Sequence, residues 1–210
     1  MAHDQNKEEM NMAEFTSLRP GTLLAPVPAV MVSCARAGKR PNIITVAWAG
    51  TVCSEPPMCS ISVRKERFSH AVIRDSGEFI INLVGQTQAR AADFCGVKSG
   101  RDVDKFSACG LTPQPVSGFQ APAIAECPLY LGCRVVSCQE LGSHDLFLAR
   151  IETVGVRNEL MDAAGKIDFN QAKLVAYNHG VYYTLGPALG FFGYSVAAPD
   201  VLERRMRELR

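Results

Sequence analysis

Apolar positions fall into short runs separated by turn-forming residues, and this spacing predicts a chain rich in β-strands. The strongest run, 43–52, is β-branched and almost continuously apolar, a pattern typical of a strand buried on both faces. Pro-Pro and Gly-containing segments separate it from its neighbours. Further strands are expected at 29–35, 58–63, 79–84, within 126–156 on both sides of a turn at 141–144, and at 174–177.

Three short helices are expected between or after these strands. Ser69 is placed to cap one that runs to about Asp75, with Gly77 as its stop. Thr87 is placed to cap a second, which ends near Cys95 before Gly96. The charged, amphipathic end of the chain, 201–210, predicts a third, and 97–122 is expected to be mostly loop.

Six or seven strands with few helices and no βαβ alternation predict a mainly β fold, an antiparallel sheet closed into a barrel. A chain of 210 residues fits one domain. We divide it into an N-terminal arm at 1–19, a barrel domain at 20–195 and a C-terminal helix at 196–210.

Composition restricts the partners. The formal net charge of +1 gives no electrostatic reason to expect nucleic acid or an anionic membrane as a partner. The N-terminus lacks the apolar core of a signal peptide, and no apolar run reaches the roughly 20 residues of a membrane span. A cytoplasmic protein is therefore expected. The eight cysteines form no C-x-x-C pair, so thiols rather than a metal site are expected.

One basic cluster stands where a strand meets a helix. Arg64, Lys65 and Arg67 precede the helix that starts near Ser69. Free N–H groups at a helix N-terminus, together with cationic side chains, favour a bound phosphate. The alternative is a solvated charge run at a turn, and this segment alone favours that alternative.

Two other features have a chemical and a plain interpretation. The small residues around Trp48, in Ala47–Thr51, would let a flat ligand reach the backbone, with Trp48 as a wall; a core tryptophan is equally consistent. His144, in a turn, could donate to a ligand or transfer a proton, or could simply be exposed. The Gly-rich segment 185–194 matches neither a P-loop nor a dinucleotide fingerprint.

Several motifs together resemble a known family. They are P-V-P at 26–28, N-x-x-T-x-A-W at 42–48, C-S-E-P-P at 53–57, S-V-R-K-E-R-F-S at 62–69, F-I-I-N at 79–82, S-G-R-D-V-D-K-F at 99–106 and E-L-G-S-H at 140–144. In this order they resemble the flavin reductase-like, FMN-binding split-barrel family, and within it they look most like the flavoredoxins.

The resemblance implies a fold and a site. The fold would be a six-stranded antiparallel split barrel of Greek-key type, forming a homodimer with noncovalent FMN near the subunit interface. Asn42, Thr45 and the segment Ala47, Trp48, Ala49, Gly50 and Thr51 would line the isoalloxazine. The ribityl chain and phosphate would be held by Ser62, Val63, Arg64, Lys65 and Ser69, with support from Asn82. His144 would lie at the open face of the flavin, as the candidate catalytic residue.

The resemblance also implies a function, with alternatives. An oxidoreductase would move electrons from NAD(P)H or a redox protein through FMN to an acceptor. A flavoredoxin-like carrier would pass electrons between proteins without direct NAD(P)H activity. A third interpretation is a barrel that has lost its flavin.

Overall fold

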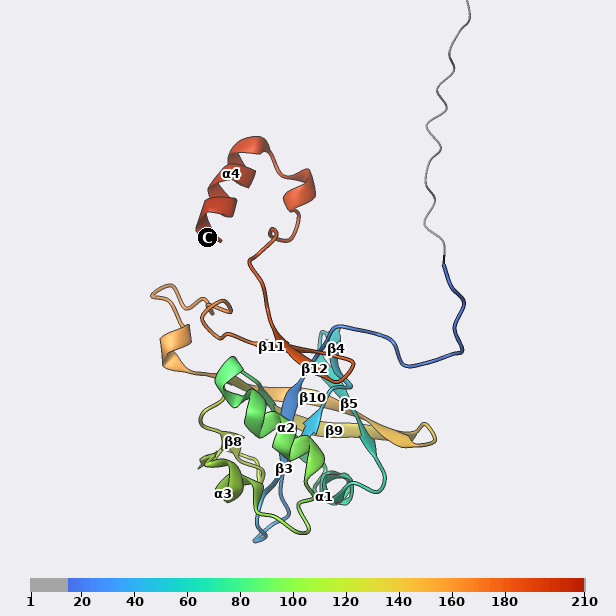
Figure 1. Ribbon diagram of the computed structural model, residues 1–210. Coiled ribbons are helices and arrows are strands. Elements are labelled where there is room, and N and C mark those ends of the chain that lie inside the picture. Colours follow the sequence, from blue (N-terminus) through green and yellow to red (C-terminus); the bar gives the residue numbers. More distant parts are fainter. Residues whose placement is uncertain (1–14, 210) are drawn as a thin grey trace, which may run out of the picture.

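The computed structural model describes residues 15–209 (Figure 1). Most of the expected N-terminal arm and the last residue of the expected C-terminal helix lie outside this range. The main element is a seven-stranded sheet in which all neighbouring strands are antiparallel. In spatial order its strands are β3 (Asn42–Val46), β2 (Val30–Cys34), β6 (Glu78–Leu83), β9 (Leu129–Glu140), β10 (His144–Val156), β5 (Pro57–Arg64) and β4 (Ala49–Ser54).

The sheet closes on itself at Ala47 and Trp48. Its two edge strands, β3 and β4, follow each other in the sequence, and these two residues alone separate them. The amide of Ser62 on β5 donates to the carbonyl of Trp48 at 2.9 Å and fixes the junction. A mainly β, antiparallel barrel is thus confirmed. The expected count of six becomes seven because one stretch bends into two strands.

The expected single strand at 43–52 is accordingly wrong in its second half. The β3 part is buried on both faces, as expected: Ile44 packs inside the barrel, and Ile43 packs outside it beneath α2 (Ala89–Val97) and α3 (Lys105–Cys109). In contrast, β4 is largely exposed, with Val52 at 51%. The apolar run continues, but no layer of structure covers β4 within the described chain.

The barrel interior is filled by large apolar side chains from every side. Phe79, Phe147 and Ile61 are fully buried in one cluster. Burial of each such side chain contributes about 1.5 to 3 kcal/mol. A second cluster joins β2 and β3 to the helices through Met31 and Phe106. Strands β2 and β3 are therefore packed on both faces, by the barrel interior on one and by the helices on the other.

The helix ends differ from expectation in three places. The first helix, α1 (Phe68–Ser76), begins after Arg67, and Ser69 lies inside it, buried and not a cap. Thr87 belongs to a 3-10 turn, η1 (Gln86–Gln88), and α2 runs on through Gly96. The stop at Gly77 is confirmed, because its φ of 69° is left-handed and its N–H bonds the carbonyl of Ile73.

The segment 97–122, expected to be mostly loop, contains α3, whose first turn is capped by Asp104. It also contains a short strand β7 (Pro113–Gln114) that pairs with β8 (Ala123–Ile124).

A hairpin packs near the barrel closure. Its strands, β11 (Val175–Asn178) and β12 (Val181–Thr184), form a small sheet with β1 (Val27–Pro28). The sequence pattern predicted β11 but not β12.

The C-terminal helix α4 (Pro199–Glu208) stands apart from the barrel in Figure 1. Of the other two 3-10 turns, η2 (Asn158–Leu160) follows β10 and η3 (Tyr194–Val196) leads into α4. Among the helices that the structure describes, none is both long enough and apolar enough to span a membrane.

Candidate functional site

A cleft of about 320 Å³ opens where the sheet closes, and we call it the closure cleft. Its volume falls at the lower end of the range of ligand pockets, about 300 to 1,000 Å³. The end of β3, the junction, the end of β5, the start of β10 and β11 all contribute to it. Its walls are Ile44, Thr45, Val46, Ala47, Trp48, Ser62, Val63, Arg64, Arg67, His144 and Tyr177.

Trp48 and His144 form one side of the closure cleft. Their ring centroids are 4.4 Å apart at 39°, and Trp48 stays 45% exposed. Ser143 Oγ lies 2.9 Å from His144 Nδ1, and His144 pairs with Arg64 across β10 and β5. Burial, together with the charge of Arg64, lowers the pKa of His144 below its ordinary value of 6.5. The imidazole is therefore neutral at pH 7.

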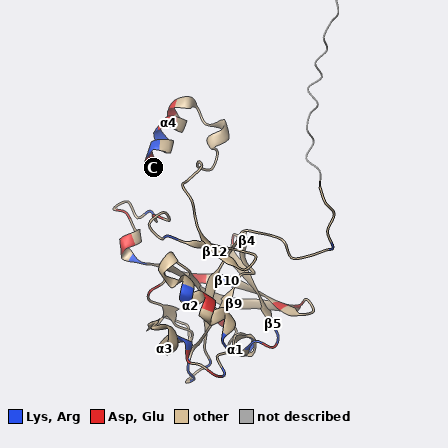
Figure 2. Ribbon diagram, in the orientation of Figure 1, with Lys and Arg blue, Asp and Glu red and all other residues tan. Residues whose placement is uncertain are grey.

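A second cleft of about 210 Å³, which we call the basic cleft, adjoins the first and shares Ile44 and Arg67 with it. The start of α1, the end of α2 and the following loop form its walls. Four cationic side chains and one carboxylate line it: Arg67, Lys98, Arg101, Lys105 and Glu66. Figure 2 shows blue segments around α1 and α3. Such a donor set fits an anionic group.

The floor of the basic cleft is built from buried polar contacts. Asn42 Nδ2 donates to Ser69 Oγ at 2.7 Å, and this bond ties β3 to α1. Gly100 packs against the same asparagine, since a Cβ at this position would overlap the side-chain oxygen of Asn42. The absence of a side chain at Gly100 therefore lets the loop approach Asn42 of β3 this closely.

Lys105 lies under the basic cleft and is only 3% exposed. Its Nζ donates to the carbonyls of Ile43 and Cys95, each at 2.7 Å. Burial lowers its pKa, and it forms no ion pair with a carboxylate of the described chain. Backbone dipoles alone offset this buried charge, so an anion in the cleft would be attracted to it.

Most residues expected at the site do lie together. Eight line one of the two clefts: Asn42, Thr45, Ala47, Trp48, Ser62, Val63, Arg64 and Ser69; His144 joins them. Thr45 Oγ1 donates to the carbonyl of Ala92 and so anchors β3 to α2. The structure therefore gathers side chains from 42 to 144 at one edge of the barrel.

Five of the residues expected at the site line neither the closure cleft nor the basic cleft. Ala49, Gly50 and Thr51 are on β4, beyond the junction. Lys65 Nζ points to other partners, Glu140 Oε2 at 3.0 Å and Asp145 Oδ1 at 3.4 Å. Lys65 is the first residue of the turn after β5, and its ion pairs with two residues of the β9–β10 hairpin direct it away from the cleft that Arg64 lines.

Asn82 is the fifth, and its role is structural. It is fully buried between β2 and β8, where Nδ2 donates to the carbonyl of Met31 at 3.0 Å. Its Oδ1 accepts from the amide of Ile124 at 2.8 Å. These bonds hold the sheet together at a distance from both clefts.

The sequence pattern missed several lining residues. Arg67 belongs to the basic cluster expected from the sequence, but the resemblance did not include it among the flavin contacts. Three further cations lie in or beside the S-G-R-D-V-D-K-F motif: Lys98, Arg101 and Lys105. Their positive charge was the sequence feature that could have identified them as phosphate contacts. Tyr177 comes from β11 and carries no such signal. No group of three or more metal-ligating side chains occurs in the part of the chain that the structure describes.

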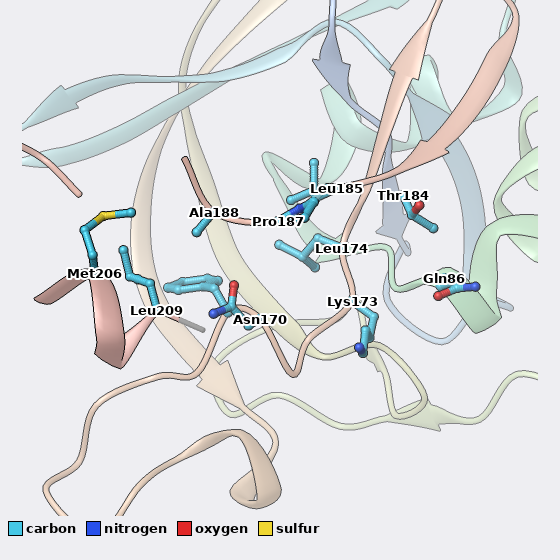
Figure 3. A pocket seen from close by; sticks show the side chains of 12 residues that line it. Gln86, Asn170, Lys173, Leu174, Thr184, Leu185, Pro187, Ala188, Met206 and Leu209 are labelled. Carbon is cyan, nitrogen blue, oxygen red and sulfur yellow. The ribbon is translucent and has the colours of Figure 1, made fainter. Parts of the chain in front are cut away.

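A larger cavity, about 720 Å³, lies elsewhere (Figure 3). It is formed by Gln86, by the segments 169–174 and 184–188 and by the end of the chain around α4, and its lining mixes apolar residues such as Leu174 and Met206 with polar ones such as Asn170. Lys173 is the one cation in its lining. The two adjoining clefts combine several cationic side chains with an aromatic ring and a histidine, so they are the better candidate site.

Comparison with known proteins agrees with this fold. Residues 23–186 match the model of the flavin reductase like domain. The flavoredoxin of Desulfovibrio vulgaris (Miyazaki F) is 32% identical, with a TM-score of 0.79 over 85% of this chain and 97% of that one. The flavoredoxin of Methanosarcina acetivorans is 26% identical, with a TM-score of 0.80 over 88% and 100%.

A curated relative has a named activity. FMN reductase (NADH) RutF 1 of Methylorubrum extorquens (strain PA1) is 28% identical over 53% of this chain and 54% of that protein. The match thus spans about half of that relative's length. Because the domain model covers most of the chain, this protein belongs to the flavin reductase-like family.

Proposed function

We propose that this protein binds FMN noncovalently across the two clefts and works as a flavin-dependent oxidoreductase. The observation that carries the proposal is the continuity of a cleft walled by Trp48 with a cleft lined by cations. FMN has the matching shape, with a flat ring system at one end and a phosphate at the other.

The residues present fit this cofactor. At the junction, Ala47 is small enough to let a ring system approach the backbone, and Trp48 offers an aromatic face. In the basic cleft, Arg67, Lys98 and Lys105 supply positive charge for a phosphate. This assignment shifts the expected phosphate contacts from Lys65 to these residues.

Bound FMN would supply the redox chemistry, by accepting a hydride from NAD(P)H and passing electrons to an acceptor. The protein would bind and orient the cofactor and keep one face open. His144, neutral at pH 7, offers a hydrogen-bonding ring nitrogen beside that face. Its proposed role is to position the electron donor or acceptor.

Trp48 makes the test direct, because it is the only tryptophan of the chain. Intrinsic tryptophan fluorescence should fall as FMN is titrated, and Trp48→Phe should remove the signal while the flavin absorbance still shows binding. NADH and NADPH are then added without oxygen. A spectrum that bleaches supports the reductase and identifies the donor, and a protein that ignores FMN contradicts the proposal.

An electron carrier is the second candidate. The exposed apolar residues beside the closure cleft favour it, since Trp48, Val52 and Tyr183 are each about half exposed and could contact a redox protein. Such a carrier would bind FMN yet oxidise NAD(P)H at a negligible steady-state rate with excess acceptor. That measurement separates the two candidates.

We also propose a homodimer in the cytoplasm. The tail beyond β12 exposes Leu189 at 88%, Phe192 at 103% and Val196 at 87%, and large exposed apolar patches mark interaction sites. All eight cysteines are free, which suits a reducing compartment. Light scattering on the purified protein measures the oligomeric state, and a monomer contradicts the dimer.

A further inference from the structure

The cavity of about 720 Å³ in Figure 3, which we call the tail cavity, has a polar end and an apolar end. The side chains of Gln86, Lys173 and Thr184 lie at one side of Figure 3, and Met206 and Leu209 lie at the other. The volume falls within the range of pockets for small organic ligands, about 300 to 1,000 Å³. A cavity divided in this way suits a molecule with a charged head and an apolar body.

Lys173 stands where the polar end of the tail cavity meets a second cavity of about 240 Å³. Gln86 and Lys173 line both spaces. The other cation in the lining of the second cavity, Arg157, pairs with Glu159 at 2.5 Å. Lys173, in contrast, forms no ion pair with any residue from 15 to 209. Its ammonium group can therefore pair with an anion that enters from either space.

The backbone of Lys173 is held in an uncommon conformation. Its φ is 48°, in the left-handed region that residues other than glycine rarely adopt. Its carbonyl accepts from the amide of Gln86 at 2.9 Å, and its own amide donates to the carbonyl of Asn170 at 3.4 Å. These bonds gather three polar residues of the lining at one place. Backbone strain of this kind is concentrated at ligand-binding and other functional sites.

The rest of the tail cavity presents apolar surface to solvent. Phe169 is 53% exposed and Leu185 is 63% exposed. Leu174, and Met206 and Leu209 at the end of the chain, are half-buried. Concentrated apolar exposure marks binding sites. Most of these side chains are aliphatic, and methionine adapts to partners of varied shape, so a flexible aliphatic chain fits this surface.

We propose that the tail cavity binds an amphipathic monocarboxylate with a flexible aliphatic chain, as in a medium-chain fatty acid. The carboxylate would pair with Lys173, and the chain would lie against Leu174 and Met206. A single lysine suits a monoanion, whereas the four cations of the basic cleft suit a phosphate. The tail cavity shares no lining residue with the closure cleft or the basic cleft, so this inference does not rest on the proposed flavin function.

The experiment compares decanoate with decanol by isothermal titration calorimetry on the full chain. Decanoate should bind one molecule per chain, and decanol, which lacks the charge, about tenfold more weakly. Lys173→Asn should raise the dissociation constant of decanoate about tenfold, because a hydrogen bond between charged groups is lost, and leave that of decanol unchanged. Asparagine tolerates the left-handed backbone. Lys39→Asn is the matched control, since Lys39 lines neither cavity, and should change neither constant.

A second variant tests the apolar end of the tail cavity. Met206 lies on α4, which stands apart from the barrel (Figure 1), so Met206→Glu should leave the barrel folded. The new carboxylate would face the aliphatic chain, and both decanoate and decanol should bind at least about fivefold more weakly. The dissociation constant of FMN should be the same with and without decanoate.

Three results would overturn the inference. The first is a wild-type chain that does not bind decanoate, and the second is an equal affinity for decanoate in the wild type and Lys173→Asn. The third is a dimer that Met206→Glu converts to a monomer in light scattering while decanoate fails to bind, because a second copy of the chain would then occupy the cavity. In each case the flavin site is tested separately by its own titration.

Discussion

His70 Nε2 and Asp145 Oδ2 lie 2.8 Å apart in the protein interior and join α1 to β10. Both side chains are almost fully buried, and the ring of Phe147 packs edge-on against His70 at 5.3 Å. Each partner is next to a cleft residue, Ser69 before His70 and His144 before Asp145. The pair therefore fixes the relative positions of the two elements that carry these side chains.

Removal of Asp145 should destabilise the fold. Breaking a buried pair leaves a polar group uncompensated, and Asp145→Ala should lower the free energy of unfolding by about 3 kcal/mol at pH 7. Urea unfolding measures this. Asp75→Ala is the control, because its pair with Arg36 is exposed and should contribute less than about 1 kcal/mol. Equal losses in the two variants would contradict the role of burial.

The pair of His70 and Asp145 also predicts that the stability of the fold depends on pH. Burial alone would raise the pKa of Asp145, but the hydrogen bond from His70 and the charge of Lys65 lower it below its ordinary 3.8. The carboxylate therefore adds stability above pH 3.8 and loses that contribution as the pH falls through its lowered pKa. The stability difference between wild type and Asp145→Ala should shrink only in that acidic range.

His144 should affect turnover more than FMN affinity. We expect His144→Ala to reduce turnover at least about tenfold, since a positioned histidine contributes on this scale or more, and to leave the FMN dissociation constant nearly unchanged. Because its pKa is lowered, the ring keeps its acceptor nitrogen at neutral pH. Turnover of the wild type should fall only below pH 6.5, and this decrease should be absent in the variant. Full activity of His144→Ala would contradict the role.

Gly100→Ala should weaken flavin binding through Asn42. The added Cβ would overlap Oδ1 of Asn42 and displace its side chain, whose Nδ2 donates to Ser69 Oγ. Loss of one buried hydrogen bond is worth about 1 kcal/mol, or about fivefold in affinity. Gly186→Ala is the matched control, since a Cβ there meets nothing within 4 Å. An unchanged affinity in Gly100→Ala would show that the loop can relax.

Lys105→Met should weaken FMN binding more than riboflavin binding. The methionine keeps the apolar stem but removes the buried ammonium, whose charge lies under the basic cleft. Riboflavin lacks the phosphate, so it should be nearly indifferent to the change. Fluorescence titration of both ligands gives the comparison, and equal losses would point to a purely structural lysine. Hydrogen bonds to charged groups are worth about 1.5 to 3 kcal/mol, so a loss of about tenfold or more is expected for FMN.

Local patterns in the sequence determined much of this protein. The β-branched run at 43–46 predicted a strand buried on both faces, because continuous apolar side chains need cover on each side. Gly77 predicted the end of α1, because a left-handed turn is accessible to glycine without strain. The motif N-x-x-T-x-A-W, through the family it resembles, implied that Asn42, Thr45 and Trp48 lie at one site, and they line the two adjoining clefts.

Tertiary structure decided what these patterns could not. The bend at Ala47 and Trp48 arises because the sheet closes there, and closure depends on strands far apart in sequence. The same closure brings His144 to Trp48, and the packing of α3 brings Lys105 under β3. Ion pairs with the distant Glu140 and Asp145 direct Lys65 away from the clefts. Asn82 instead forms hydrogen bonds with Met31 on β2 and Ile124 on β8. Side-chain direction and long-range partners are properties of the folded chain, and no local pattern contains them.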